Sequence, residues 1–286
     1  MSQYVIFADS SVDLPIELIK QYNLQIVNLH LFVGNVEEDI DTLDSHTFYD
    51  RLRAGEVAST SAPSLQEYVE KMEPFLAEGK DILYLGFSEA LSCSFNNGKL
   101  AMEDLAEKYP DRKLYPISTK CASTGHGLLT ILAARKQAEG ATIDELKAWA
   151  EENAPKLVQW FTVDDLMFLK RGGRISAATA LVGTMLGIKP VLHVDDEGRL
   201  INMSKARGRK ASLQALVDKA KETAIEPATQ TMTICHGDCV EDAEWVANKL
   251  KAELNVPEVI IAPTGTVIGA HSGPGTLALF FLGTQR

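Results

Sequence analysis

Residues 4–27 read YVIFADSSVDLPIELIKQYNLQIV, and this stretch decides the class of fold. A run of β-branched and aromatic residues stops at Asp9-Ser10-Ser11, which predicts a strand followed by a turn. Asp13-Leu14-Pro15 is typical of a helix N-terminus, because proline fits the first helical turn. The stretch therefore predicts strand, turn, helix and strand, which is the opening of an α/β protein.

The same alternation continues through the first half of the chain. Residues 81–88 and 112–119 predict strands, and residues 96–109 and 125–140 predict helices, the second of them closed by Gly140. Strands that alternate with helices predict a mostly parallel sheet with helices on its faces. By the usual size of a domain, we expect these elements to form an N-terminal lobe over residues 1–156.

The pattern of predicted elements changes after a predicted amphipathic helix at 142–157. Strand-like segments at 158–163, 189–195 and 199–204 follow, joined by turns such as residues 196–199. We expect a C-terminal α/β lobe with a mixed sheet over residues 157–286. Its further predicted elements are a helix at 209–224, a strand at 231–237, a helix at 242–254 and a strand at 258–264.

Composition and charge narrow the classes of function. The chain has 286 residues, of which 45% are hydrophobic, enough for a substantial core. Its formal net charge of -11 would repel a nucleic acid, and the start of the chain lacks the pattern of a signal peptide. No run approaches the roughly 20 apolar residues that span a bilayer. We expect a cytoplasmic protein with no transmembrane segment, no nucleic-acid partner and no disulfide among its four cysteines.

Three segments place hydroxyl side chains next to residues that reverse the chain: STSAPS at 59–64, SEALSCS at 88–94 and GAHSGPG at 269–275. We expect each to lie where a strand or loop gives way to a helix. The free N–H groups and dipole of a helix N-terminus can hold a carboxylate or a phosphate, but Ser and Thr there also serve as simple caps. Both interpretations stay open, and capping is the commoner one.

Residues 265–281, GTVIGAHSGPGTLALFF, join a glycine-rich half to an apolar half. The glycines would let the backbone approach a ligand closely, but their spacing fits neither the dinucleotide loop nor the phosphate loop. We therefore expect no nucleotide cofactor. His271 can bind a ligand or only donate to a nearby carbonyl, and LALFF can line a lipid site or belong to the core.

Two basic clusters stand out in this acidic chain. A compact array of donors of this kind suits a phosphate or an acidic partner, but it can also be a solvated turn or a polar helix face. The first cluster is Lys170, Arg171 and Arg174 around two glycines, and the second is Lys205, Arg207, Arg209 and Lys210.

A metal site and a hydrolase triad are two further interpretations. Cys235, His236 and Cys239 are the strongest metal candidates, but closed zinc sites draw on two separated ligand pairs and no second pair follows. We expect no metal, and we expect Asp238 to cap the next helix. Ser92 and His271 with an acid would make a triad, although no G-x-S-x-G elbow surrounds any serine.

In chain order, eight motifs closely resemble the DegV family of bacterial fatty-acid-binding proteins: DSSVDLP, TSAPS, LSCS, FLKRGGRIS, IKPVLHVDDEGRL, KARGRK, HGD and GTVIGAHSGPGTLALFF. The resemblance covers essentially the whole chain. It implies a two-domain α/β fold, with an N-terminal three-layer α/β/α lobe, a mostly parallel sheet there, and a C-terminal α/β lobe with a mixed sheet. It also implies that one long-chain fatty acid lies buried at or near the lobe interface.

The resemblance further implies a partner and a set of site residues. A separate ATP-dependent fatty-acid kinase would phosphorylate the bound acid to an acyl phosphate, a step toward phospholipid synthesis. The residues that would surround the carboxylate are Thr60, Ser61, Ser92 and His271. The residues that would lie near the entrance, docking the kinase or facing the phosphate, are Arg171, Arg174 and Arg207.

One departure from the family pattern concerns the serine segment. The family commonly continues Ser-Gly-Thr, whereas this chain has Ser92-Cys93-Ser94, so a side chain stands where a glycine would leave the backbone open. The geometry of the head-group site or the selectivity for the chain is expected to differ accordingly.

We hypothesise that the protein binds and presents the acid without catalysis of its own, while the kinase supplies nucleotide, metal and catalysis. Two alternatives stay open: an acyl-ester hydrolase that uses Ser92 and His271, and a lipid sensor or carrier without a kinase. Transient contact with a membrane surface is compatible with each of the lipid-binding interpretations.

Overall fold

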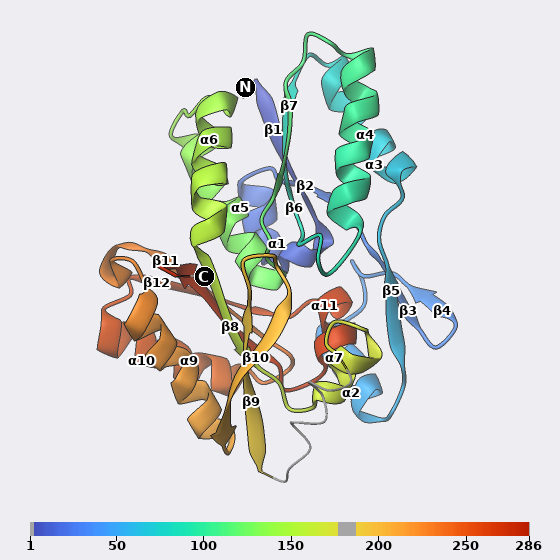
Figure 1. Ribbon diagram of the computed structural model, residues 1–286. Coiled ribbons are helices and arrows are strands. Elements are labelled where there is room, and N and C mark those ends of the chain that lie inside the picture. Colours follow the sequence, from blue (N-terminus) through green and yellow to red (C-terminus); the bar gives the residue numbers. More distant parts are fainter. Residues whose placement is uncertain (1–2, 177–186, 286) are drawn as a thin grey trace.

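The computed structural model describes residues 3–176 and 187–285, and within them the strands form three sheets (Figure 1). The first sheet is parallel, with the strand order β2-β1-β6-β7. Strand β1 is buried along its whole length, as expected for a parallel strand covered on both faces. The four strands are β1 (Tyr4–Asp9), β2 (Gln25–Val27), β6 (Asp81–Gly86) and β7 (Leu114–Ser118).

Helices cover both faces of this sheet (Figure 1). On one face, α3 (Leu65–Ala77) and α4 (Ser94–Lys108) pack against side chains such as Phe7 and Tyr84. On the other face lie α1 (Ile16–Gln21), α5 (Ser123–Ala138) and α6 (Ile143–Asn153). The three-layer α/β/α arrangement with a parallel sheet that the sequence predicts is confirmed.

The second sheet has six strands in the order β10-β9-β8-β13-β11-β12. Only β11 and β12 pair in parallel, so the predicted mixed sheet is confirmed. Helices α9 (Arg209–Thr223) and α10 (Val240–Leu254) cover one face. The strands are β8 (Leu157–Thr162), β9 (Ile188–Val194), β10 (Leu200–Arg207), β11 (Thr231–His236), β12 (Glu258–Pro263) and β13 (Leu277–Leu282). The boundary at residues 156 and 157 stays a prediction, and β8 begins beside it.

Helix α5 contributes to the cores of both sheets. Its residues Leu128 and Leu129 pack with the second sheet, whereas Ile131 and Ala134 pack with the first. Near its C-terminal end, Arg135 donates two hydrogen bonds of 2.8 and 2.9 Å to the Glu258 carboxylate on β12. A helix that is buried on opposite sides in this way holds the two sheets at a fixed separation.

A third, antiparallel sheet was not among the expected elements. Its order is β4-β3-β5, and it packs with α2 and α11 in a small separate core. Its short strands carry little hydrophobic periodicity, so no pattern in the sequence distinguishes them from loops. The elements are β3 (His30–Val33), β4 (Val36–Glu38), β5 (Ala58–Ser61), α2 (Ser45–Arg53) and α11 (Thr266–Ser272).

The three hydroxyl-rich segments differ in their relation to helices. Ser64 caps α3 in a capping box with Glu67, and the segment 88–94 leads into α4, as expected. The expectation for GAHSGPG is wrong, because this segment ends α11 instead of beginning a helix. Gly273 and Gly275 have φ values of +77° and +76°, which turn the chain from α11 into β13.

The contact between α5 and the second sheet generates the first prediction. A Cβ atom added at Gly125 would lie 2.3 Å from a ring carbon of Phe280, so Gly125→Ala must displace the helix or the ring. We expect Gly125→Ala to lower the free energy of unfolding by about 1 to 3 kcal/mol in urea denaturation. The control is Glu139→Ala at the exposed end of α5, with an expected change within about 0.5 kcal/mol. Equal stability of the two variants would contradict this packing.

Candidate functional site

A cavity lies between the second sheet, α11 and the loops that follow β6 and β7. Its volume is about 90 Å³, and the empty space that continues from it into open solvent brings the total to about 730 Å³. Most of its wall is apolar, with side chains from distant parts of the chain such as Leu29, Phe87, Phe161, Val194 and Ile268. Such a cavity suits a long apolar ligand.

The LALFF segment, which lies in strand β13, both lines the cavity and contributes to a hydrophobic core. Ala278 and Phe280 face the cavity, whereas Leu277, Leu279 and Phe281 point to the opposite face and pack under α9 and α10. Successive side chains of a strand alternate between its faces, so one apolar run lines the cavity and builds a core. Both interpretations of LALFF are therefore correct for different residues.

Polar side chains gather in one part of the cavity wall: Thr60, Ser92, Arg174 and His271. The Thr60 hydroxyl and Nε2 of His271 are 2.7 Å apart, which joins β5 to α11. Nδ1 of His271 is buried and has no hydrogen-bond partner within the described ranges. If Nε2 of His271 carries the proton, it donates to Thr60 and the Thr60 hydroxyl is free to donate elsewhere. If Nδ1 carries the proton, Nε2 accepts from Thr60 and the Nδ1 N–H is free.

Arg174, which the family resemblance placed near the entrance, lines the cavity wall. Its guanidinium donates hydrogen bonds of 3.0 and 2.8 Å to the Leu91 carbonyl and a further one to the Gly172 carbonyl. Burial lowers the pKa of Arg174 from its usual value, but a guanidinium remains charged at neutral pH. No carboxylate of the described residues forms an ion pair with this cation.

Two glycines bring the KRGGR and GAHSGPG motifs into contact. A Cβ atom at Gly172 would lie 2.2 Å from Nδ1 of His271. In the reverse direction, a Cβ atom at Gly273 would lie 2.5 Å from the ring of Phe168. Helix α7 (Leu166–Arg171), which carries Phe168, can approach α11 this closely only because both positions lack side chains. The two glycines thus set the position of His271.

Ser92 reaches the cavity from the loop before α4. Its hydroxyl accepts a 3.1 Å hydrogen bond from the Ser94 backbone N–H at the start of that helix. The neighbouring Cys93 is exposed and has a φ of -78°, a backbone conformation that any L-residue adopts. The cysteine in place of the family glycine is therefore accommodated without backbone strain at this position.

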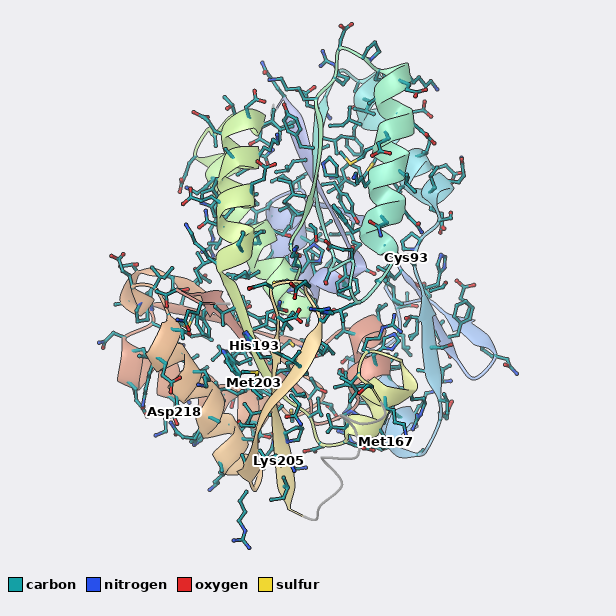
Figure 2. All side chains as sticks on the ribbon, viewed as in Figure 1. Cys93, Met167, His193, Met203, Lys205 and Asp218 are labelled. Carbon is teal, nitrogen blue, oxygen red and sulfur yellow. The ribbon has the colours of Figure 1, made fainter. Side chains whose placement is uncertain are left out.

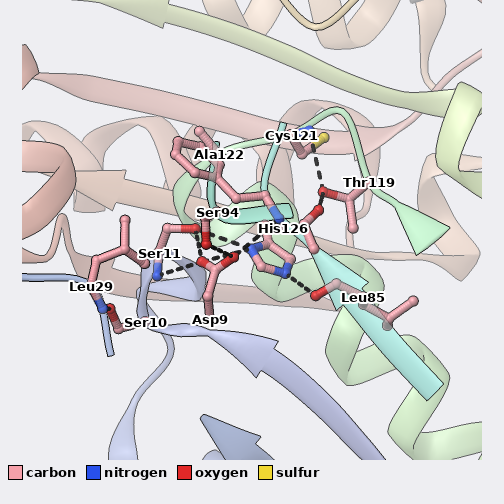
Figure 3. A network of polar contacts seen from close by, with 12 residues as sticks. Asp9, Ser10, Ser11, Leu29, Leu85, Ser94, Thr119, Cys121, Ala122 and His126 are labelled. Carbon is pink, nitrogen blue, oxygen red and sulfur yellow. Dashed lines mark hydrogen bonds and ion pairs between the residues drawn. The ribbon is translucent and has the colours of Figure 1, made fainter. Parts of the chain in front are cut away.

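A buried network around Asp9 holds this loop (Figure 3). One carboxylate oxygen of Asp9 accepts hydrogen bonds from the Phe87 N–H at 3.2 Å and from the Ser94 hydroxyl at 3.1 Å. The other accepts from Ser11, whose hydroxyl is 3.2 Å from Nδ1 of His126. Asp9 thereby fixes both ends of the loop that carries Ser92, a positioning role that no sequence motif indicated.

Three of the predicted site residues lie outside the cavity wall. Ser61 is exposed and follows Thr60 on β5, so its side chain points to the opposite face. Arg171 is exposed and stacks over the ring of Phe168 with its guanidinium carbon 5.1 Å from the ring centre. Arg207 is exposed at the end of β10, the strand that also carries Met203 and Lys205 (Figure 2).

The metal candidates Cys235, His236 and Cys239 make separate contacts, and Nδ1 of His236 accepts a 3.3 Å hydrogen bond from the Cys239 N–H. Cys235 is buried in the cavity wall, where burial raises its pKa to about 11, whereas Cys239 bonds to Arg209. The expected cap at Asp238 is wrong, because Cys239 occupies the N-cap of α10. Asp238 instead pairs with Arg53 at 2.6 Å and with His46 at 3.0 Å, two residues of α2.

Comparisons with known proteins agree with this architecture. A sequence model described as that of uncharacterised proteins of the DegV family matches residues 3–284. A DegV domain-containing protein of Clostridium perfringens is 44% identical over 290 residues, which cover 100% of this chain and 99% of the relative. The chain belongs to the DegV family.

Solved structures of DegV proteins have the same fold. A DegV lipid-binding protein from Thermotoga maritima matches with a TM-score of 0.87 and 28% identity over 100% of both chains. A DegV family protein from Thermus thermophilus, described by its fatty acid binding, matches with a TM-score of 0.86 and 27% identity over 98% and 99% of the two chains. DegV of Bacillus subtilis, described as a fatty acid binding protein, gives 0.83 and 25% over 98% and 99%.

Two further features of this DegV chain bear on the alternatives. The described part of the chain contains no helix with the length and apolar character of a membrane span. His271 bonds to Thr60 and, within residues 3–176 and 187–285, has no carboxylate partner that would complete a triad. The hydrolase interpretation therefore lacks its third member in the described structure.

His271 generates a prediction for pH dependence. Burial, together with the nearby Arg174 charge, lowers the pKa of His271 from 6.5 to about 4. The folded state then binds fewer protons than the unfolded state. The contribution of His271 to the free energy of unfolding is therefore fully present above pH 6.5 and is lost as the pH falls toward 4. The free energy of unfolding in urea is measured at about pH 7.5 and at about pH 5. Between these two pH values, we expect it to fall by about 2 kcal/mol less in His271→Asn than in the wild type. Equal losses would show that His271 titrates normally.

Proposed function

We propose that this protein binds one long-chain fatty acid, with the tail in the apolar cavity and the carboxylate at Thr60, Ser92, Arg174 and His271. The observation that carries this proposal is the half-buried Arg174 cation, which lines a mostly apolar cavity and, among the described residues, bonds only to carbonyls. A buried charge without a counter-charge is costly, and a fatty-acid carboxylate supplies that counter-charge. The DegV proteins of Thermotoga maritima, Thermus thermophilus and Bacillus subtilis, described as lipid or fatty acid binding, support the assignment.

The energetics fit a ligand of this class. Each buried methylene contributes about 0.8 kcal/mol, so a tail of about 16 carbons contributes roughly 11 kcal/mol before the costs of association. The polar end needs only to compensate for the desolvation of the carboxylate. The free donor of the Thr60 and His271 pair and the Ser92 hydroxyl are neutral groups that serve this purpose.

We further propose that the bound acid is presented to a separate ATP-dependent kinase, which converts the carboxylate to an acyl phosphate. Arg171 and Arg207 support this role, because they are exposed cations on a body of net charge -11. Exposed cations attract an acidic partner surface and steer its approach. Since neutral groups make up most of the carboxylate site, the carboxylate keeps nucleophilic oxygens for attack on a phosphate.

The lipid site is tested by two neighbouring residues of β5. Native mass spectrometry of the purified protein is expected to show one bound long-chain acid that is released on denaturation. We expect Thr60→Ala to weaken binding by about 1 to 3 kcal/mol, because a hydrogen bond to a charged group is lost. Ser61→Ala, on the exposed face of the same strand, is the matched control and is expected to bind like the wild type. An empty protein that also refuses added fatty acids would refute the proposal.

The kinase role is tested with the exposed arginines. When an ATP-dependent fatty-acid kinase is added, Arg207→Ala and Arg171→Ala are expected to slow acyl-phosphate formation by about fivefold or more, with unchanged lipid affinity. Lys99→Ala, an exposed cation on α4, is the control. Normal phosphorylation of both arginine variants would rule out these residues as the docking patch, and no phosphorylation of the wild type would favour a sensor or carrier.

A further inference from the structure

Ser272, the last residue of α11, is the residue from which we draw a further inference, one that rests on the proposed function. It lines the cavity and is only 5% exposed. Its hydroxyl has no hydrogen-bond partner among the described residues. We propose that Ser272 donates a hydrogen bond to the carboxylate of the bound acid and is thus a further residue of the head-group site.

The other hydroxyl and amide side chains of the cavity wall have partners within the described ranges. The Ser123 hydroxyl donates to the Asp13 carboxylate, and the Thr276 hydroxyl lies 2.9 Å from the Ser272 carbonyl and 2.8 Å from the Gly273 carbonyl. The remaining members with partners are Thr60, Ser92 and Gln159. A buried hydroxyl without a partner is unfavourable, so the Ser272 hydroxyl is the group of this wall that a ligand would satisfy.

The spacing along α11 places Ser272 beside the proposed carboxylate site. Residues four apart lie on the same side of a helix, separated by one turn of about 5.4 Å. The side of α11 that lines the cavity therefore changes from two apolar side chains to two polar ones within one turn, and Ser272 lies at the level of His271. The four residues of α11 in the cavity wall are Val267, Ile268, His271 and Ser272.

His271 and Ser272 can contact the same carboxylate. Their Cα atoms are about 3.8 Å apart, as in any pair of consecutive residues, and both side chains line one cavity. Nδ1 of His271 and the Ser272 hydroxyl are both buried and without a partner in the described structure. A carboxylate has two oxygens that each accept more than one hydrogen bond. One oxygen beside the pair of Thr60 and His271 leaves the other for Ser272.

The end of α11 holds Ser272 in position before a ligand binds. The Gly273 N–H donates a 2.8 Å hydrogen bond to the Gly269 carbonyl, and the Thr276 hydroxyl bonds to the Ser272 carbonyl. The backbone around Ser272 is thus fixed by contacts that leave its hydroxyl unused. A donor that is already positioned loses little conformational entropy when the ligand binds.

The experiment measures the dissociation constant of palmitic acid and the melting temperature of the lipid-free protein. We expect Ser272→Ala to weaken binding by about tenfold, because a hydrogen bond to a charged group is lost. The lipid-free variant is expected to melt no lower than the wild type, because the hydroxyl has no partner to lose in the free protein. Ser272→Cys keeps a heavy atom at this position, but a thiol is a weak donor, so it is expected to weaken binding nearly as much.

The possible results separate the hydrogen bond from packing and from the proposed function. Wild-type affinity in Ser272→Ala would overturn the proposal, and wild-type affinity in Ser272→Cys would also do so, because it would attribute the loss in Ser272→Ala to empty space. A lower melting temperature of lipid-free Ser272→Ala would assign the hydroxyl to the fold and would likewise overturn the proposal. Failure of the wild type to bind palmitic acid would instead refute the proposed function. Weakened binding by Thr60→Ala with unchanged binding by Ser272→Ala would overturn only the role of Ser272.

Discussion

The burial of α5 between the two large sheets is the constraint on which the rest of the structure depends. The helix packs Leu128 and Leu129 against one sheet and Ile131 and Ala134 against the other. A glycine at position 125 lets it approach Phe280 closely. Because α5 cannot shift toward either sheet without overpacking that sheet and leaving a gap at the other, the loop before it is fixed as well. One part of the cavity wall is thus set by the packing of a helix that reaches the cavity at its first residue, Ser123.

The polar end of the cavity is assembled differently, from short elements that meet through glycines and hydrogen bonds. Gly172 and Gly273 allow α7 and α11 to approach, the Leu91 carbonyl holds Arg174, and Asp9 anchors the loop of Ser92. None of these elements has a large apolar core of its own. The position of the proposed carboxylate site therefore depends on directional contacts, whereas the apolar part of the cavity depends on packing.

The periodicity of the sequence predicted the long strands and helices, but it did not predict contacts between residues that lie far apart in the chain. The alternation in residues 4–27 and 81–140 identifies the parallel sheet and its helices, because strands and helices there are long and apolar. The short strand that carries Thr60 and the inward direction of Arg174 left no periodic signal. Gln159 was missed because a single polar residue in a strand is normally solvent-exposed, and only contacts with residues far along the chain show that it is buried.

The polar side chains of the cavity wall differ in electrostatic balance. The Gln159 side chain in the cavity wall is neutral, and its carbonyl and amino group each have a backbone partner, so it neither requires nor attracts a charge. The Arg174 guanidinium, in contrast, bonds only to carbonyls among the described residues, and the neighbouring His271 is kept neutral because burial and that cation lower its pKa to about 4. A carboxylate would therefore be stabilised beside the Arg174 cation and not at the Gln159 amide. In the proposed complex with a fatty acid, this balance favours the orientation that places the carboxylate at Arg174.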